Sequence, residues 1–367
     1  HRNDRRENQL IYYRPVSSFA AKVHCSLARV LGIGGGNGAC LPLTAPVLMA
    51  DGTWKPLKDI EPGNLVIAAD PVSGLAVPSK VRHTFRSGLK EVWRVTYSDG
   101  EGFSATAEHQ VPMLLGAGRW TSKKNPKVPA KVSLGSQLKR IGRASPAKRQ
   151  SCISPQNIDF LPLETPKIPG YLLGALLGDG GLTQQIRFFN TDPGVISRVQ
   201  KEVLGLGDKF RQYDAVSWGI SGQNTLKILR ELGLKGCDSH TKFIPTFALR
   251  ASRAYRLELL AGLIDTDGSH DSWTSVSKKL ALGFISLVRS LGGKAILSAR
   301  KNEYGVFFQV YWRHNERMPL CISHKQSSGL NDYTRKVCRS AESLGVFECG
   351  DLEVEHPAHC YVTEGYT

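Results

Sequence analysis

The sequence has no apolar segment long enough to cross a membrane. None of its hydrophobic runs approaches the ~20 residues that a membrane-spanning helix requires. The start of the chain, His1-Arg2-Asn3-Asp4-Arg5-Arg6, also lacks the pattern of a secretory signal peptide. We therefore expect a cytoplasmic protein with no membrane partner.

The eight cysteines form no C-x-x-C pair. They are scattered over the chain at positions 25, 40, 152, 237, 321, 338, 349 and 360. This spacing argues against a zinc site and against a disulfide framework. Most of the cysteines are expected to be buried thiols, and Cys40 is treated separately below.

Acidic residues are in short supply. The chain of 367 residues has 32 Asp and Glu against 48 Lys and Arg, a net charge of +16. Residues 119–150 hold ten Lys or Arg and no acid. A polyanion is the natural partner, with DNA foremost, and we predict that this basic segment contacts the DNA backbone. The alternative for the segment is a solvated loop.

Two apolar nonapeptides, each ending in an acid and a glycine, stand 88 residues apart. They are LLGALLGDG at residues 172–180 and LAGLIDTDG at residues 260–268. Read as helices, both present small residues on one face, so the two helices can cross at close range. Gly180 and Gly268 would close them in the left-handed conformation.

The acid shared by the two copies is the one before the final glycine. Asp179 aligns with Asp267, whereas Asp265 aligns with Leu177. The shared acids would lie at the negative ends of two helix dipoles, and crossing the helices would bring like charges together. A divalent cation between them would relieve that repulsion, so Asp179 and Asp267 are the predicted metal ligands and Asp265 is not.

The nonapeptides resemble the signature of the LAGLIDADG homing endonucleases, in the single-chain form with two pseudo-symmetric halves. The resemblance implies a monomer that cuts both strands of duplex DNA, with Mg²⁺ held by the two shared acids and activating water. Lys242, in Thr241-Lys242-Phe243-Ile244-Pro245, matches the family's Lys-x-Ile-Pro block and is implied to be catalytic. Lys325 is its pseudo-symmetric candidate, the alternative being a solvated surface lysine.

The same order of elements is expected after each nonapeptide. The first half predicts a strand at 186–189, a helix near 195–204, strand signals near 213–220 and a helix at 225–234. The second half predicts a strand at 272–275, a helix near 278–291 and strands at 295–298 and 306–312. Such a duplication would form a saddle of strands that can lie along duplex DNA.

A second set of motifs flanks the first. Cys40 opens a β-rich stretch with Ala50-Asp51-Gly52 as a hairpin turn, strands around residues 92–97 and a Thr106-x-x-His109 motif. Residues 132–141 could be a further strand, and Asp351-Leu352-Glu353-Val354 with His359 returns to β character near the end. This order resembles the splicing domain of inteins, the all-β fold shared with hedgehog autoprocessing modules.

The intein resemblance implies roles for five residues and no cofactor. The Cys40 thiol would attack the carbonyl carbon of Ala39 in an N-to-S acyl shift, with Thr106 positioning the scissile peptide and His109 as the acid. Asp351 matches the acid that tunes and relays protons at the nucleophile, and His359 a supporting histidine.

The family pattern ends in His-Asn followed by Ser, Thr or Cys, and these are missing before Thr367. We therefore expect the sequence to be truncated a few residues short, the alternative being a natural loss. As given, the chain should form a thioester or cleave at Ala39 without completing splicing.

Residues 1–39 end in a glycine-rich run, Gly34-Gly35-Gly36-Asn37-Gly38. With the upstream residues 13–15 and 24–29, the segment looks like the start of the ATPase of a phage terminase large subunit. A flexible linker is the alternative. The Gly-Lys-Ser/Thr half of a phosphate-binding loop does not follow, which disfavours an ATPase as the function of the whole chain.

The expected architecture is multidomain: an all-β Hint splicing domain, split by an α+β LAGLIDADG endonuclease with two pseudo-symmetric αββαββα halves. The expected boundaries are 1–39 for the flanking extein, 40–141 and 336–367 for the splicing domain, and 142–335 for the endonuclease, with halves at about 168–250 and 251–335. The expected partners are the exteins and DNA of the uninterrupted terminase allele, in a bacterial or phage-infected cell. The alternative is an intein-derived DNA-binding module with a decayed nuclease, or a cleavage-only autoprocessing domain.

Overall fold

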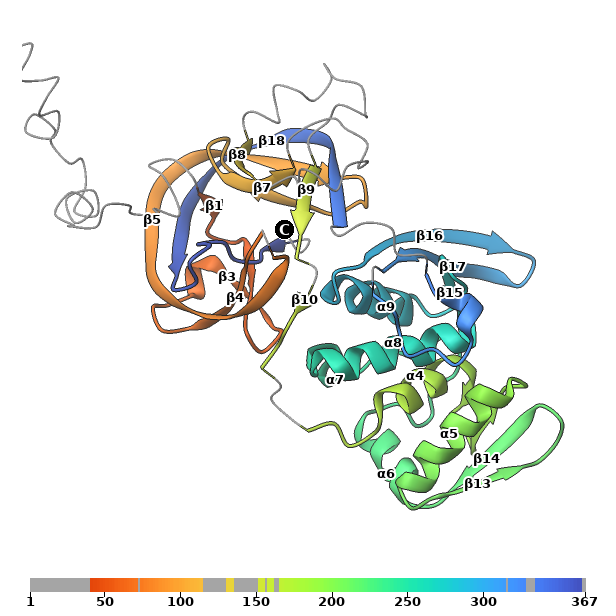
Figure 1. Ribbon diagram of the computed structural model, residues 1–367. Coiled ribbons are helices and arrows are strands. Elements are labelled where there is room, and N and C mark those ends of the chain that lie inside the picture. The colour runs from red at the N-terminus through yellow and green to blue at the C-terminus, as the bar shows by residue number, and fades with distance from the viewer. Residues whose placement is uncertain are drawn as a thin grey trace, which may run out of the picture. The chain divides into compact units, whose positions relative to one another are not determined.

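The computed structural model describes residues 40–71, 73–114, 130–134, 151–155, 157–161, 165–314, 316–327 and 334–364 (Figure 1). No helix in these ranges is long and apolar enough to span a membrane. The expectations for residues 1–39 and for most of the basic segment 119–150 lie outside the described residues. We call residues 40–161 with 334–364 the β region, and residues 165–327 the α/β region.

Two long antiparallel strands frame the β region. Strands β5 (Leu75–Tyr97) and β18 (Thr334–Val354) pair from Tyr97 opposite Cys338 to Val81 opposite Val354, with four shifts of register. Gly88 and Gly345, with φ of +76° and +94°, supply the backbone freedom that such irregularities need. Both strands are strongly curved in Figure 1.

Seven shorter strands complete this nine-stranded sheet, in which β10-β5-β18-β9-β7-β8 is the main order and β1, β4 and β6 pair alongside. They are β1 (Leu41–Pro42), β4 (Leu65–Ala69), β6 (Gly102–Ala105), β7 (Gln110–Leu114), β8 (Ala130–Ser133), β9 (Ser151–Ser154) and β10 (Asn157–Ile158). The described strand β8 is earlier and shorter than the strand expected at 132–141.

The predicted turn at Asp51-Gly52 is confirmed. It joins β2 (Pro46–Leu48) to β3 (Trp54–Pro56), and the 3-10 helix η2 (Leu57–Asp59) follows. Gly52 has φ +78°, a conformation that glycine adopts without steric cost, and the Asp51 carboxylate accepts a hydrogen bond from Thr53 N–H at 2.8 Å.

The first half of the α/β region has the predicted order. Its elements are α4 (Gly170–Asp179), β11 (Gly180–Gly181), β12 (Ile186–Phe189), α5 (Pro193–Gly205), β13 (Lys209–Gln212), β14 (Ser217–Ser221) and α6 (Asn224–Glu231). The sheet order is β11-β12-β14-β13. The strand signals near residues 213–220 prove to span a turn and β14.

The second half repeats this order, except that one strand pair is reduced to a single bridge and the last helix to a 3-10 helix. After α7 (Thr246–Arg250), it contains α8 (Arg253–Asp267), β15 (Ser272–Ser275), α9 (Lys278–Ser290), β16 (Lys294–Asn302), β17 (Gly305–Arg313) and the 3-10 helix η4 (Ser323–Lys325). Where the first half pairs β11 with β12, this half has only the single bridge Gly268–Trp273. The expectation of two complete αββαββα halves is therefore wrong for the second half as described.

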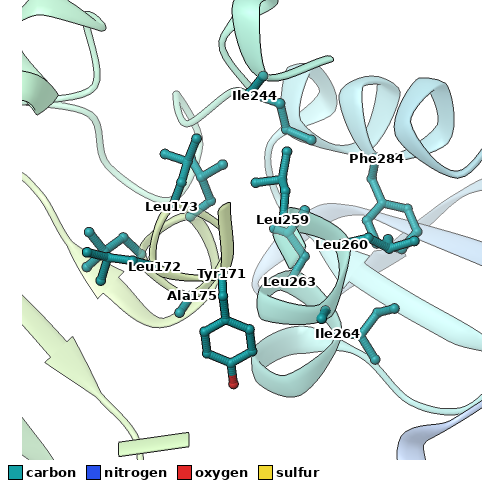
Figure 2. Close-up of a cluster of buried hydrophobic side chains, with 14 of the residues drawn as sticks. Tyr171, Leu172, Leu173, Ala175, Ile244, Leu259, Leu260, Leu263, Ile264 and Phe284 are labelled. Atoms are coloured by element: carbon teal, nitrogen blue, oxygen red, sulfur yellow. The ribbon is translucent and has the colours of Figure 1, made fainter. Parts of the chain in front are cut away.

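Helices α4 and α8 cross at glycine, as the small-residue pattern predicted. A Cβ atom on Gly174 would lie 2.3 Å from the carbonyl oxygen of Leu259, and one on Gly262 would lie 2.3 Å from that of Tyr171. Both distances are too short for any side chain, so only glycine permits this approach. Figure 2 shows the two helices with Leu259 and Leu263 beside α4, and Phe284 on the opposite flank of α8. The crossing is the centre of the large apolar core of the α/β region.

The glycines that end these helices are not left-handed, contrary to the prediction. Gly180 has φ −86° and Gly268 has φ −104°, both in extended conformation. A different constraint explains the glycine, because a Cβ at Gly180 would lie 2.2 Å from the carbonyl oxygen of Leu176 and one at Gly268 2.8 Å from Ile264 Cα. The chain turns back across the helix end too closely for a side chain.

Candidate active sites

The two shared acids lie together at the ends of the crossed helices. Asp179 is the last residue of α4 and Asp267 the last residue of α8. A Cβ on Gly178, next to Asp179, would lie 3.1 Å from Asp267 Oδ2. The glycine crossing thus brings two carboxylates from opposite halves into one place.

The surroundings of each carboxylate raise its pKa. Loss of hydration and then the neighbouring Asp179 raise the pKa of Asp267 to about 6, although Lys242 and Lys325 oppose the change. Burial also raises the pKa of Asp179, opposed by the amide of Asn190, which donates to Asp179 Oδ2 at 2.7 Å, and by both lysines. Asp267 as a residue is exposed, so solvent screens part of its shift.

The two predicted lysines occupy matching positions. Lys242 is buried, and its Nζ donates to the carbonyl of Gly178 at 2.8 Å. Lys325 Nζ donates to the carbonyls of Asp265 at 2.7 Å and of Thr266, which aligns with Gly178, at 3.2 Å. Each ammonium therefore binds the free carbonyls at one helix C-terminus. A solvated surface position for Lys325 is excluded.

Partial burial lowers the pKa of both lysines, while the acids oppose this. For Lys242 the opposing charges are Asp267 and Asp179, and for Lys325 they include Asp265, Asp179 and Asp267. The four side chains thus form one electrostatic cluster of two acids and two bases.

Asp265 has a different environment from the shared acids. It is 1% exposed, and its Oδ2 accepts from Tyr171 OH at 2.8 Å and from Cys321 N–H at 2.7 Å, while Oδ1 accepts from Ile322 N–H at 3.1 Å. These bonds fix the segment that leads into η4 and Lys325. Asp265 is thereby committed to protein contacts, in keeping with the prediction that it binds no metal.

The carboxylate pair has the donor set of a hard cation. Among the described residues no three His, Cys, Asp or Glu side chains converge, so the protein would supply two carboxylates. Mg²⁺ is commonly held by one or two carboxylates, with water and substrate phosphates filling the other positions. A pocket of about 310 Å³ adjoins Asp267. It is lined by Leu177, Gly178, Ser239, Lys242, Asp267, Thr274, Ser275, Val276 and Leu280. The residues therefore fit such an ion.

A second site forms around Cys40. The Cys40 N–H donates to Thr106 Oγ1 at 3.1 Å, and Thr106 N–H donates to the Cys40 carbonyl at 2.9 Å. His109 N–H donates in turn to the Thr106 carbonyl at 3.1 Å, which is a turn that closes the Thr-x-x-His motif. The structure thus brings Thr106 onto the amide that precedes the Cys40 side chain, and His109 into the same turn.

His109 is neutral at pH 7. Burial lowers the pKa of His109 to about 4, and its Nδ1 is buried with no hydrogen-bond partner among the described residues. A neutral ring offers one N–H donor and one acceptor nitrogen. His109 can therefore act through an N–H donor but carries no standing positive charge.

Asp351 lies on β18, opposite Cys40. Leu41 pairs with Gly350, which brings Cys40, one residue earlier, beside Asp351, one residue later. Asp351 is 8% exposed and its Oδ1 accepts from Tyr361 OH at 2.6 Å. Burial raises the pKa of Asp351 to about 7, and the Tyr361 hydroxyl opposes this rise.

The Cys40 thiol is buried, and burial raises the pKa of Cys40, opposed by Ser87 and Lys90. Asp351 adds to the rise. Cys40, Val92 and Cys349 form a small buried cluster. Burial therefore favours the protonated thiol at neutral pH, and a role as nucleophile would need a neighbour that accepts its proton.

His359 makes no described hydrogen bond to the other predicted residues of the splicing site. It has φ +47°, its N–H donates to the His356 carbonyl at 2.9 Å, and its Nδ1 is buried without a partner among the described residues. Its described hydrogen bonds reach neither Cys40 nor Asp351. Its supporting role stays a prediction.

The sequence interpretation missed Asn190 and Tyr361. Asn190 follows strand β12 and binds Asp179, whereas Tyr361 follows Cys360 near the end of the described chain and binds Asp351. For Tyr361 a signal existed, since it is a hydroxylated aromatic residue two positions after a predicted site histidine. Nothing near Asn190 distinguished it from a turn residue.

No protein-family model matches the chain. Among curated proteins, the chain is 28% identical over 360 residues to the replicative DNA helicase DnaB of Mycobacterium intracellulare, covering 89% of this chain and 57% of the helicase. It is 34% identical over 97 residues to the Sonic hedgehog protein of Danio rerio, covering 26% of this chain and 23% of that protein. The chain thus spans little more than half of the helicase and about a quarter of the hedgehog protein.

Solved structures similar to the chain include inteins and a homing endonuclease. The DnaB intein from Synechocystis sp. PCC 6803 has a TM-score of 0.23 and 17% identity, covering 31% of this chain and 67% of the intein. The homing endonuclease I-DmoI in complex with DNA and Ca has a TM-score of 0.29 and 15% identity, covering 40% of this chain and 82% of that protein.

Proposed function

We propose that the chain is an intein whose β region carries out protein splicing chemistry at Cys40 and whose α/β region is a site-specific, double-strand DNA endonuclease. The observation that carries the proposal is the assembly of two separate sites from motifs far apart in the sequence. One is Cys40 with Thr106 and Asp351, and the other is Asp179 with Asp267. The similarity of 97 residues to a hedgehog protein supports the splicing assignment, because hedgehog autoprocessing modules share the fold that the motifs resemble.

At the first site, the Cys40 thiol would attack the carbonyl carbon of Ala39. Asp351, with a pKa of about 7, is present as carboxylate and as acid near neutral pH, so it can take the thiol proton and return it to the leaving nitrogen. Thr106 Oγ1 already accepts the N–H of that nitrogen and would hold the peptide in place. His109, expected from the sequence to be the acid, would instead donate an N–H bond to the reacting peptide, because burial lowers its pKa to about 4 and leaves the ring neutral.

At the second site, Asp179 and Asp267 would hold Mg²⁺. When bound, the ion would polarise a phosphate and lower the pKa of a water molecule. The lysines neutralise the helix C-termini next to the acids, and Lys242, buried beside the pocket, would stabilise charge that develops on the phosphate. Asn190 orients the Asp179 carboxylate through its 2.7 Å bond.

Duplex DNA is the proposed substrate of the second site. Exposed basic and aromatic side chains stand on the two hairpins of the α/β region, β13–β14 and β16–β17. They are Lys209, Arg211, Tyr213, Arg300, Lys301 and Tyr304. Basic side chains bind phosphates irrespective of sequence, and the net charge of +16 favours the same partner.

The host is proposed to be a terminase large subunit of a phage, on the resemblance of residues 1–39 alone. The endonuclease is proposed to be an insertion between residues 141 and 336 of the splicing domain, acting as a monomer in the bacterial cytoplasm. The similarity to a helicase covers 89% of the chain, far more than the first 39 residues, and so does not identify the host.

The splicing assignment is tested by thiol-induced release of residues 1–39, followed by mass spectrometry. The wild-type chain should release the fragment on addition of dithiothreitol, since thiols attack the thioester. Cys40→Ala should release none. Equal release from both proteins would contradict Cys40 as the nucleophile.

The nuclease assignment is tested on a plasmid that joins the coding sequence of residues 1–39 to the host sequence that follows the intein. The wild-type chain should linearise it with Mg²⁺, and Asp267→Asn and Asp179→Asn should each lose cleavage by about a thousandfold or more while still binding the DNA. Binding without cleavage by the wild type would favour a decayed nuclease instead.

A further inference from the structure

Tyr361 lies outside the predicted splicing site, but its side chain bonds to one of the predicted residues of that site, Asp351. Its hydroxyl donates to Asp351 Oδ1 at 2.6 Å, the same oxygen that accepts from Leu352 N–H at 2.8 Å. Tyr361 itself is held by the β region, since it bridges Ala68 of β4 and packs against the core of that region. A fixed hydroxyl on a buried carboxyl group restricts where that carboxyl can point.

The backbone next to Asp351 is closely packed. Gly350 lies between β1 and β5 so tightly that a Cβ there would be 2.5 Å from the Phe85 carbonyl oxygen and 2.8 Å from Leu43 Cδ2. The next residue, Asp351, lies beside Cys40 through the pairing of β1 with β18, and its carboxyl group accepts a hydrogen bond from the Tyr361 hydroxyl. Cys40 raises the pKa of Tyr361 through its charge, which is a further sign that the three groups are neighbours.

We propose that Tyr361 is a positioning residue, whose hydroxyl fixes the Asp351 carboxylate beside the Cys40 thiol and keeps it ready to accept the thiol proton. This inference rests on the proposed splicing function. The S–H proton passes to Asp351, the thiolate attacks the carbonyl carbon of Ala39, and the carbon–nitrogen bond breaks as the nitrogen takes the proton back from Asp351. No oxidant or cofactor enters the step.

The titratable groups around Asp351 set the direction of the expected effect. Cys40 precedes β1, Cys349 lies on β18 two residues before Asp351, and Cys360 precedes Tyr361, while Lys90 of β5 acts on both Cys40 and Cys349. The Tyr361 hydroxyl lowers the pKa of Asp351 against the effect of burial. Removing the hydroxyl should therefore raise that pKa further above 7 and leave less carboxylate at neutral pH.

The test is the pH profile of fragment release by Tyr361→Phe, between pH 5.5 and 9. Dividing the variant rate by the wild-type rate at each pH cancels the titration of the added dithiothreitol. We expect a deficit of about tenfold below pH 7 that shrinks toward pH 9, as an upward pKa shift of about one unit requires. Tyr311→Phe, which removes the same atom from an exposed residue of β17, should match the wild type throughout.

A deficit that is equal at every pH, or no deficit, would overturn the positioning role. If the wild type releases no fragment, the splicing proposal fails, and a second measurement still tests Tyr361. Carbon-13 NMR of the Asp351 carboxyl group should show its pKa higher by about one unit in Tyr361→Phe. An unchanged pKa would refute the inference independently of any activity.

Discussion

The two halves of the α/β region hold the same acid at the same helix end but support it with different residues. Asp179 of the first half is bound by the Asn190 amide, and the lysine that caps its helix, Lys242, is held through its carbonyl by Ser277 Oγ at 2.6 Å. In the second half the support comes from within the motif. Asp265, which replaces Leu177, anchors the segment that carries Lys325.

The comparison shows that two halves can share the same acid and lysine although different residues hold these side chains in place. The parts shared by both halves are the acid, the lysine and the glycine crossing. The supporting residues differ because the connections differ, with Lys242 preceding α7 and Lys325 lying in the short η4. Three substitutions test whether the shared parts matter more than the supports.

The largest effect is expected at the crossing. Gly262→Ala would place a methyl group 2.3 Å from the Tyr171 carbonyl oxygen and force α4 and α8 apart, which should cost about 3 kcal/mol of unfolding free energy. Hydrogen exchange of peptides from the two helices would measure the loss locally.

Gly205→Ala is the matched control for this substitution. Gly205 ends α5 with no atom within 4 Å of an added Cβ, so alanine should be neutral or slightly stabilising there. Equal exchange rates in Gly262→Ala and wild type would mean that the glycines do not set the helix spacing.

A smaller loss of unfolding free energy is expected when Asp265, which anchors the segment carrying Lys325, is replaced. Asp265→Leu copies the first half but leaves Tyr171 OH and the N–H groups of Cys321 and Ile322 without their acceptor, which should cost about 2 kcal/mol. Asp265→Asn retains an acceptor oxygen and should lose less. Urea unfolding measures both, and a leucine variant as stable as the wild type would show that the anchor is dispensable.

The smallest effect concerns the shared acids and depends on pH. Because the folded pKa of Asp267, about 6, exceeds its ordinary value, folding favours its protonated form, and metal-free stability falls as pH rises from 4 through 6. Asp267→Asn should thus equal the wild type at pH 4 and exceed it by about 1 kcal/mol at pH 7, an amount reduced because solvent reaches the residue.

Thermal unfolding in EDTA at the two pH values checks this expectation. Added Mg²⁺ should reverse the order at pH 7, since a bound ion stabilises only the protein that retains both carboxylates. A difference that stays the same at both pH values would show that the fold does not raise the pKa of Asp267.

Local sequence patterns were enough to predict most helices and strands of the α/β region. Strands β12 and β15 and helices α5 and α9 were predicted within one or two residues of their bounds, because their apolar residues repeat at the spacing of one buried face. The reduced second half could not be predicted, since the loss of a strand there depends on how the chain leaves Gly268. The extended conformation of both closing glycines has the same origin, namely crowding by the preceding helix turn.

The site residues were predictable where a motif repeats or matches a family, and not elsewhere. Asp179 and Asp267 could be placed together because two glycine-faced helices must cross. The Asn190 and Tyr361 contacts arise from pairs 11 and 10 residues apart that meet only through the fold. The ionisation of Asp351 likewise depends on its burial in the folded β region, which no local pattern reveals.

The pairing of β1 with β18 has a consequence for timing during synthesis. Cys40 and Asp351 are separated by about 310 residues of chain, and translation adds ~5–20 residues per second. If Asp351 accepts the Cys40 proton as proposed, the thiol would lack this acceptor for roughly 15–60 seconds after Cys40 is made. The peptide bond before Cys40 would then stay intact until the far end of the β region has been synthesised.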